Sequence, residues 1–156
     1  MSDADLDSLL EDLKSPAQEV RQAATQELWR RWFHQKGIIG LELLQKAQIF
    51  LEAGEAVEAE TILTRAIATL PDFAEAWNRR AVLYYVLKNY RKAIADCQEV
   101  LRLNPIHFGA LHGLGLCYAA LGEYSAAIET FRRALEIQPY AIENQRLLLE
   151  CTAKLS

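Results

Sequence analysis

Apolar and small residues recur along this chain with a period of 34 residues. The recurrence covers seven sets of positions, each with matched chemistry in three successive copies. The sets are Leu43, Trp77, Leu111; Ala47, Ala81, Gly115; Phe50, Tyr84, Tyr118; Ala59, Ala93, Ala127; Leu63, Cys97, Phe131; Ala66, Val100, Ala134; and Pro71, Pro105, Pro139. A fixed period of this length is typical of stacked helical units, in which each unit buries its apolar face against the next.

Each copy has the pattern of two helices joined by a turn. In residues 74–107, Trp77, Ala81 and Tyr84 have the 3–4 spacing that lines one face of a helix. Lys88-Asn89 predicts the turn, and Pro105 ends the second helix because proline has no N–H to donate. The chain is therefore predicted to be all-α, with eight to nine helices and no strand. Helix ends are expected near Gly37, Gly54, Pro71, Lys88, Pro105, Gly122 and Pro139.

The segments Ala74-Glu75-Ala76-Trp77 to Asn104-Pro105 and Leu111 to Gln138-Pro139 resemble tetratricopeptide repeats. The resemblance covers residues 40–141, as units 40–73, 74–107 and 108–141. It implies a right-handed α-solenoid, continuous over residues 39–156, whose first helices line a concave groove. It also implies a protein-protein interaction module, an adaptor or assembly factor, that binds a partner segment and is not an enzyme.

Residues 1–38 predict a further helical hairpin of a different kind. Leu9 to Pro16, followed by Val20 to Ala24 and Leu28, resembles a single HEAT repeat. A stack of hairpins exposes an apolar face at each end. We therefore expect residues 3–36 to cap the first repeat, and residues 142–156 to form a solvating helix after the last one. The residues expected to pack on the first repeat are Trp29, Trp32 and Phe33, and an exposed aromatic docking patch is the alternative.

Arg80 interrupts a set of packed positions that is apolar in the third copy, where Leu114 is its equivalent. The helical register places Asp96 of the second helix opposite it. We predict an ion pair between Arg80 and Asp96 inside the hairpin, and the alternative is that Arg80 contacts a ligand.

Composition and charge narrow the possible partners. The net charge is −4, and only residues 74–107 carry an excess of basic groups. Nucleic-acid binding needs a continuous basic face, so it is not expected. The acidic start of the chain and the lack of a long apolar run predict a cytoplasmic protein without membrane insertion. Three scattered cysteines, Cys97, Cys117 and Cys151, fit buried thiols in a reducing compartment.

The sequence contains no motif that indicates a metal, a cofactor or a catalytic group. His34, His107 and His112 have no carboxylate or cysteine at ligand spacing. Gly109, Gly113 and Gly115 come near the spacing of a phosphate-binding loop, but they lie within a helical pattern. We interpret these glycines as small residues that lower the floor of the groove. No cofactor and no metal ion is expected.

The candidate binding residues are those that face the concave side of the three first helices. The expected contacts are Leu44, Gln48 and Leu51 in the first copy, Asn78, Arg79, Val82 and Tyr85 in the second, and His112 and Leu116 in the third; Leu41, Glu75, Gly109 and Ala119 complete the wall. This wall is mainly apolar and favours a protein or peptide segment with apolar anchors and one acidic group facing Arg79. A monomer or weak homo-oligomer is expected.

Two other uses of the groove remain open from the sequence. RNA binding, as in related helical repeats, and enzymatic use of the groove are the alternatives. Some tetratricopeptide proteins bind the carboxyl-terminal tail of heat-shock chaperones through lysines and asparagines on this wall. Leu44, Val82 and Gly109 stand where such a clamp would need polar or basic groups, so that ligand is not expected.

Overall fold

The computed structural model describes residues 3–156, with side chains from residue 5 onward, and this part of the chain contains nine helices and no strand. The helices are α1 (Asp3–Asp12), α2 (Gln18–Phe33), α3 (Gly37–Glu52), α4 (Ala56–Thr69), α5 (Ala74–Val86), α6 (Tyr90–Leu103), α7 (Phe108–Ala120), α8 (Tyr124–Ile137) and α9 (Ile142–Leu155). The all-α prediction is confirmed. Residues 1 and 2, which belong to the expected amino-terminal unit 1–38, lie outside the described residues.

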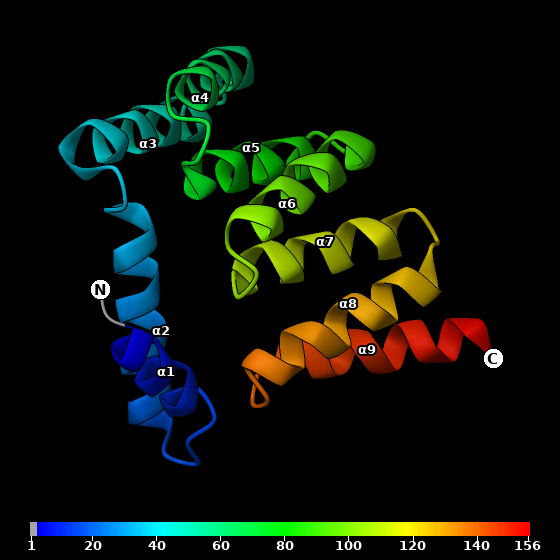
Figure 1. The fold of residues 1–156 in the computed structure, drawn as a ribbon. Helices are drawn as coiled ribbons and strands as arrows, with labels where there is room; N and C mark the ends of the chain where they lie inside the picture. Colours follow the sequence, from blue (N-terminus) through cyan, green and yellow to red (C-terminus); the bar gives the residue numbers. More distant parts are fainter. Residues whose placement is uncertain (1–2) are drawn as a thin grey trace.

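The helices from α3 onward form hairpins stacked side by side (Figure 1). The pairs are α3 with α4, α5 with α6, and α7 with α8, and α9 packs on α8. Each hairpin turns at a residue with positive φ, and these residues, Gly54, Lys88 and Gly122, are 34 positions apart. The amide that follows each of them donates to a carbonyl five residues earlier, which is the ordinary way to end a helix at such a turn.

Small residues let the two helices of each hairpin approach closely. Ala47 and Ala59 in the first hairpin and Ala81 and Ala93 in the second are all at most 3% exposed. In the third hairpin, a Cβ on Gly115 would lie 2.5 Å from Cε1 of Phe131, so the absence of a side chain is what admits that ring. Gly115 is therefore part of the hairpin core, and its predicted place on the groove floor is wrong.

The predicted ion pair inside the second hairpin is confirmed. Nε and Nη2 of Arg80 donate to the two carboxylate oxygens of Asp96, each at 2.8 Å. The Asp96 side chain is 5% exposed and that of Arg80 is 16% exposed. The hydrogen bonds from Arg80 to Asp96 raise the pKa of the guanidinium above its ordinary value. Arg80 is thus held within the structure by a bidentate pair.

The α1–α2 hairpin lies elsewhere than expected. Helix α2 runs along one edge of the stack, from α3 to the turn between α8 and α9 (Figure 1). Phe33 packs on the first repeat, but the Trp32 ring stacks on His107 at 4.3 Å, and Trp29 packs against Phe108. The prediction that Trp29 and Trp32 pack on the first repeat is therefore wrong: both pack at the start of the third repeat.

The position of the α1–α2 hairpin is explained by an apolar strip along the edge of the stack. The ends of the later helices place Ile106, Phe108 and Ile137 together, and α1 and α2 cover this apolar strip with Leu13, Ala24 and Leu28. Meanwhile Ile38, Ile39 and Ile49 on α3 stay 65–74% exposed. The hairpin therefore covers the apolar strip at the edge and leaves these residues of α3 exposed. None of the helices described is both long enough and apolar enough to cross a membrane.

A candidate binding groove between α2, α5 and α7

A narrow cavity lies between the first helices of the second and third repeats. Its volume is about 180 Å³. Helix α5 supplies Asn78, Ala81, Val82 and Tyr85, α6 supplies Cys97, and α7 supplies Gly109, His112, Gly113, Leu116 and Cys117. The 3–4 spacing along α5 and α7 turns these residues to one side, and Gly113 has no side chain to fill the space. The lining is mainly apolar.

A second, wider cavity opens between α2 and α5, with a volume of about 660 Å³. Helix α2 and the residue after it contribute Gln26, Trp29, Arg30, Phe33 and His34; α5 contributes Asn78, Arg79 and Val82. Asn78 and Val82 line both cavities, so the two adjoin each other. One wall of the groove is therefore formed by a helix that precedes the repeats.

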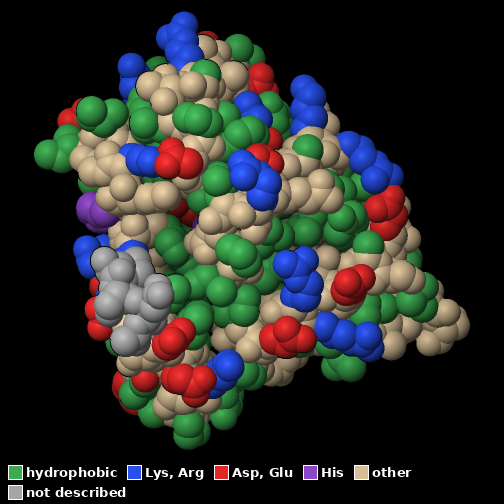
Figure 2. Space-filling view, viewed as in Figure 1, with side chains coloured by type: hydrophobic (Ala, Val, Ile, Leu, Met, Phe, Trp, Pro, Cys, Tyr) green, Lys and Arg blue, Asp and Glu red, His purple; other side chains and the backbone are tan. Residues whose placement is uncertain are grey.

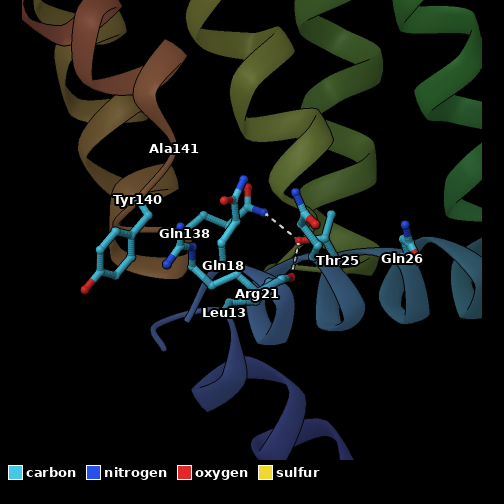
Figure 3. Close-up of a pocket in the computed structure, with 9 residues that line it drawn as sticks. Leu13, Gln18, Arg21, Thr25, Gln26, Gln138, Tyr140 and Ala141 are labelled. Carbon is cyan, nitrogen blue, oxygen red and sulfur yellow. Dashed lines mark hydrogen bonds between the residues drawn. The ribbon is translucent and has the colours of Figure 1, made fainter. Parts of the chain in front are cut away.

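A third cavity of about 470 Å³ continues along α2 toward the turn between α8 and α9 (Figure 3). It shares Gln26 with the wide cavity. Across it, Thr25 accepts a hydrogen bond from Gln138 at 3.5 Å, and the Arg21 guanidinium lies 4.2 Å from the centre of the Tyr140 ring. These contacts join the start of α2 to the end of the third repeat.

Arg79 is fixed in the groove by contacts to three different helices. Its Nη1 donates to Oε1 of Gln48 on α3 at 2.9 Å, and its guanidinium lies 5.0 Å from the centre of the Phe33 ring of α2. Its Nε is 3.6 Å from Oε2 of Glu75 on its own helix. Because these contacts hold the side chain while leaving it 29% exposed, Arg79 presents a preorganised positive charge.

Beneath the tryptophans of α2 lies a buried Glu75–His107 pair. The two side chains are fully buried, with Nε2 of His107 at 2.6 Å from Oε1 of Glu75. Nδ1 of His107 accepts from the Ala110 amide at 3.0 Å, which caps the amino end of α7. Nε2 therefore carries the proton and donates to Glu75. Oε2 of Glu75 has no hydrogen-bond partner.

Sequence reasoning missed this pair. Glu75 was expected on the open wall of the groove, but its side chain is fully buried, so that expectation is wrong. His107 was considered only as a possible metal ligand, and no partner for it was predicted. The available signal was that His107 occupies the position equivalent to Phe73, which is fully buried. A histidine at a position buried in another repeat needs a polar partner.

The structure brings most, but not all, of the predicted contact residues together. Asn78, Val82, Tyr85, His112 and Leu116 line the narrow cavity, and Arg79 lines the wide one beside it. Gln48 reaches the site only through its bond to Arg79. Leu51, Leu41 and Ala119 line none of the three cavities.

The prediction that Leu44 contacts a partner in the groove is wrong. Leu44 is 4% exposed and belongs to the core of the first repeat, where Phe33 of α2 also packs. The sequence did not predict that four residues of α2 line the groove, because their pattern does not show which surface α2 will pack against. These residues are Gln26, Trp29, Arg30 and Phe33.

The thiols of the narrow cavity are chemically quiet. Burial raises the pKa of Cys117 to about 11 and also raises that of Cys97 well above its ordinary value. Both thiols are therefore neutral near pH 7 and behave as small apolar lining groups. His112 is held by a hydrogen bond from its Nδ1 to Oδ1 of Asn144 on α9, at 2.6 Å.

Stacked helical hairpins with an elongated groove define a helical-repeat protein. The sequence profile described as the tetratricopeptide repeat matches residues 74–107 and 109–140. Residues 74–107 and 109–140 are therefore tetratricopeptide repeats.

Comparison with known proteins supports this assignment. A TPR repeat-containing protein of Rhizobium etli is 35% identical over 135 residues, which cover 86% of this chain and 66% of that protein. The first TPR of Spaghetti (RPAP3), solved bound to the HSP90 peptide SRMEEVD, is similar with a TM-score of 0.71 and 26% identity, over 74% of this chain and 91% of that one. The Sgt2 TPR domain from Aspergillus fumigatus has the same fold, with a TM-score of 0.68 and 21% identity over 73% of this chain and 77% of that one. The matched region spans just under two thirds of the length of the Rhizobium protein.

Proposed function

We propose that this chain is a non-catalytic adaptor that binds a segment of a partner protein in its concave groove. The observation that carries the proposal is the narrow apolar cavity between α5 and α7, where Val82, Tyr85 and Leu116 converge. Partly exposed apolar side chains around a pocket are where binding energy tends to concentrate. In this proposal residues 39–156 form one domain of three repeats and a closing helix, and the α1–α2 hairpin is part of the same unit.

The comparisons support a protein segment as the ligand. The similar RPAP3 domain was solved with a bound peptide. The chemistry of this groove differs from a purely polar clamp, because Val82 is 49% exposed at its centre and the cavity beside it is mainly apolar. We therefore propose a ligand with apolar anchors and one acidic group for Arg79.

RNA binding is the less favoured alternative. On the face shown in Figure 2, acidic and basic side chains are interspersed and form no extended basic patch. A nucleic-acid site would need clustered Lys and Arg side chains to neutralise phosphates.

The test compares two identical changes one helical turn apart. Val82→Glu places a charge at the mouth of the narrow cavity, whereas Val86→Glu places the same charge on the same helix outside the three cavities. Val82 and Val86 are 49% and 68% exposed, so each change should alter stability by only about 0.5 kcal/mol. Proteins captured from native cell lysate are quantified for both variants and for the unchanged chain.

Val82→Glu should abolish capture of proteins that the unchanged chain and Val86→Glu retain. Capture that survives Val82→Glu but disappears when α2 is altered at Gln26 and Arg30 would place the partner on the amino-terminal hairpin alone. In that case the groove assignment is wrong.

A further inference from the structure

The three cavities adjoin one another, and α2 lines the wide cavity and the third one. The narrow and wide cavities share Asn78 and Val82, and the wide and third cavities share Gln26. In a simple stack of hairpins the groove has only the first helices as its wall. Here a helix from outside the repeats runs opposite them along the edge of the stack (Figure 1).

The narrow cavity has the size of one side chain. Its volume is about 180 Å³. An apolar cavity of ~150 Å³ is large enough to hold benzene. The narrow cavity therefore has room for one large aliphatic or aromatic side chain.

The wide cavity beside it has a positively charged lining. Its charged or titratable lining residues are Arg30, His34 and Arg79. Glu27 accepts hydrogen bonds from both Arg30 and Arg31, which lower its pKa to about 2. Because one carboxylate is shared by two guanidiniums, this rim keeps an excess of positive charge. A carboxylate of the bound segment complements it.

The third cavity suits the backbone of an extended segment. Gln18, Gln22 and Gln26 are spaced by four along α2 and line this cavity together with Gln138, the residue after α8. Carboxamides both donate and accept hydrogen bonds, as peptide groups require, and do so whatever the side chains of the segment. Helix α2 has 16 residues, so it is about 24 Å long, which is the length of about seven extended residues.

We propose that α2 is the second wall of the binding site, and that its occupant is an extended partner segment of about seven residues carrying one large apolar side chain followed by a carboxylate. The apolar side chain enters the narrow cavity, the carboxylate meets Arg30 and Arg79, and the remaining backbone lies along the glutamines of α2. This inference rests on the proposed function.

The experiment uses a display library of random dodecapeptides, selected on the unchanged full chain. Affinities of enriched peptides are then measured by fluorescence anisotropy. Arg30→Gln tests α2, and Arg102→Gln is its matched control, because each arginine is paired with a glutamate three residues earlier. The side-chain exposures are 59% and 32% for Arg30 and Glu27, and 63% and 30% for Arg102 and Glu99. Gln26→Glu is likewise matched by Ala23→Glu, an exposed residue of α2 outside the three cavities.

Enriched peptides should share a large apolar residue followed by Asp or Glu. Arg30→Gln and Gln26→Glu should weaken them by about tenfold or more, as expected for a lost hydrogen bond to a charged group or a new like charge. Arg102→Gln and Ala23→Glu should change affinity by less than about twofold, a difference expected of surface positions away from the site.

Two results would overturn the inference in distinguishable ways. If affinity falls with Val82→Glu but not with Arg30→Gln or Gln26→Glu, the groove binds segments and α2 is not its wall. If no peptide is enriched, or if binding is indifferent to Val82→Glu, the proposed function itself fails. A consensus without the apolar residue or without the carboxylate would contradict the chemistry assigned to the two cavities.

Discussion

The indole of Trp29 occupies the space beside Gly109, since a Cβ atom on residue 109 would lie 2.5 Å from Cη2 of Trp29. This close approach brings α2 against the start of α7. It also makes Gly109 a direct probe of how α2 is held, because any side chain there must push the ring away.

Gly109→Ala should therefore destabilise the docking of α2. A helical alanine is favoured over glycine by about 1 kcal/mol, but the clash with a half-buried ring of α2 outweighs this gain. We expect faster amide hydrogen exchange in residues 18–33, with little change in α5 and α6. Unchanged exchange in α2 would mean that the ring moves aside without loss of packing.

Gly113→Ala should have the opposite effect on stability. A Cβ there would meet only Sγ of Cys97, at an ordinary 3.7 Å. The change should raise the free energy of unfolding by roughly 0.5–1 kcal/mol. It should also weaken segment binding, because the methyl group enters the narrow cavity. Stability is measured by denaturant titration and binding by anisotropy. A gain of stability together with a loss of binding cannot come from a folding defect. Unchanged binding would show that the bound segment does not occupy the narrow cavity.

The Arg80–Asp96 pair predicts a strongly non-additive double variant. Asp96→Thr alone leaves a largely buried guanidinium without its carboxylate partner and should cost about 3 kcal/mol. The equivalent residues of the third repeat are Leu114 and Thr130, both buried. Changing Arg80→Leu and Asp96→Thr together should therefore recover most of the loss. Chemical denaturation of the two single variants and the double variant checks this, and simple additivity would show that the pair is not coupled.

Buried thiols predict a loss of stability in alkali. Burial raises the pKa of Cys117 from 9.0 to about 11, so the unfolded chain releases this proton at lower pH than the folded one. The contribution is fully present below pH 9 and is lost as the pH rises toward 11; two pKa units correspond to roughly 3 kcal/mol. Unfolding free energies at pH 8 and pH 10.5 should differ less in Cys117→Ala than in the unchanged chain. If the pH 8 to pH 10.5 difference is the same in Cys117→Ala as in the unchanged chain, other titrating groups cause the loss of stability.

The Glu75–His107 pair predicts a single imidazole tautomer. Nδ1 accepts from the Ala110 amide and Nε2 faces the Glu75 carboxylate. Long-range ¹H–¹⁵N correlation spectra should show His107 neutral, with the proton on Nε2. A protonated Nδ1 would mean that the cap of α7 is not made as described.

The sequence was sufficient for the repeats and insufficient for the hairpin. The 34-residue spacing predicted the helices, their ends and the Arg80–Asp96 pair, because these depend on contacts within one hairpin or between neighbours. The strip formed by Ile106, Phe108 and Ile137 exists only after the repeats have stacked. No local pattern could therefore show where Trp29 and Trp32 would pack.

The same limit applies to the candidate groove. Val82 and Tyr85 follow from the register of α5, whereas Arg30 and Gln26 join them only through the position of α2. Leu44 has the register of a groove residue but is covered by its own repeat core, since Phe33 of α2 packs there as well.

The course of α2 along the stack also fixes how many repeats can lie between its two ends. Lys36, in the turn after α2, pairs with Asp72 in the first repeat. Along α2 itself, Trp32 stacks on His107 at the start of the third repeat, and Thr25 meets Gln138 at its end. Most repeat arrays grow or shrink by whole units, because each unit touches only its neighbours. Here one more or one fewer unit between α3 and α8 would leave the last contacts of α2 a full repeat out of register. The length of α2 therefore matches the number of repeats it spans, and duplication or loss of one of these repeats would require a helix of a different length.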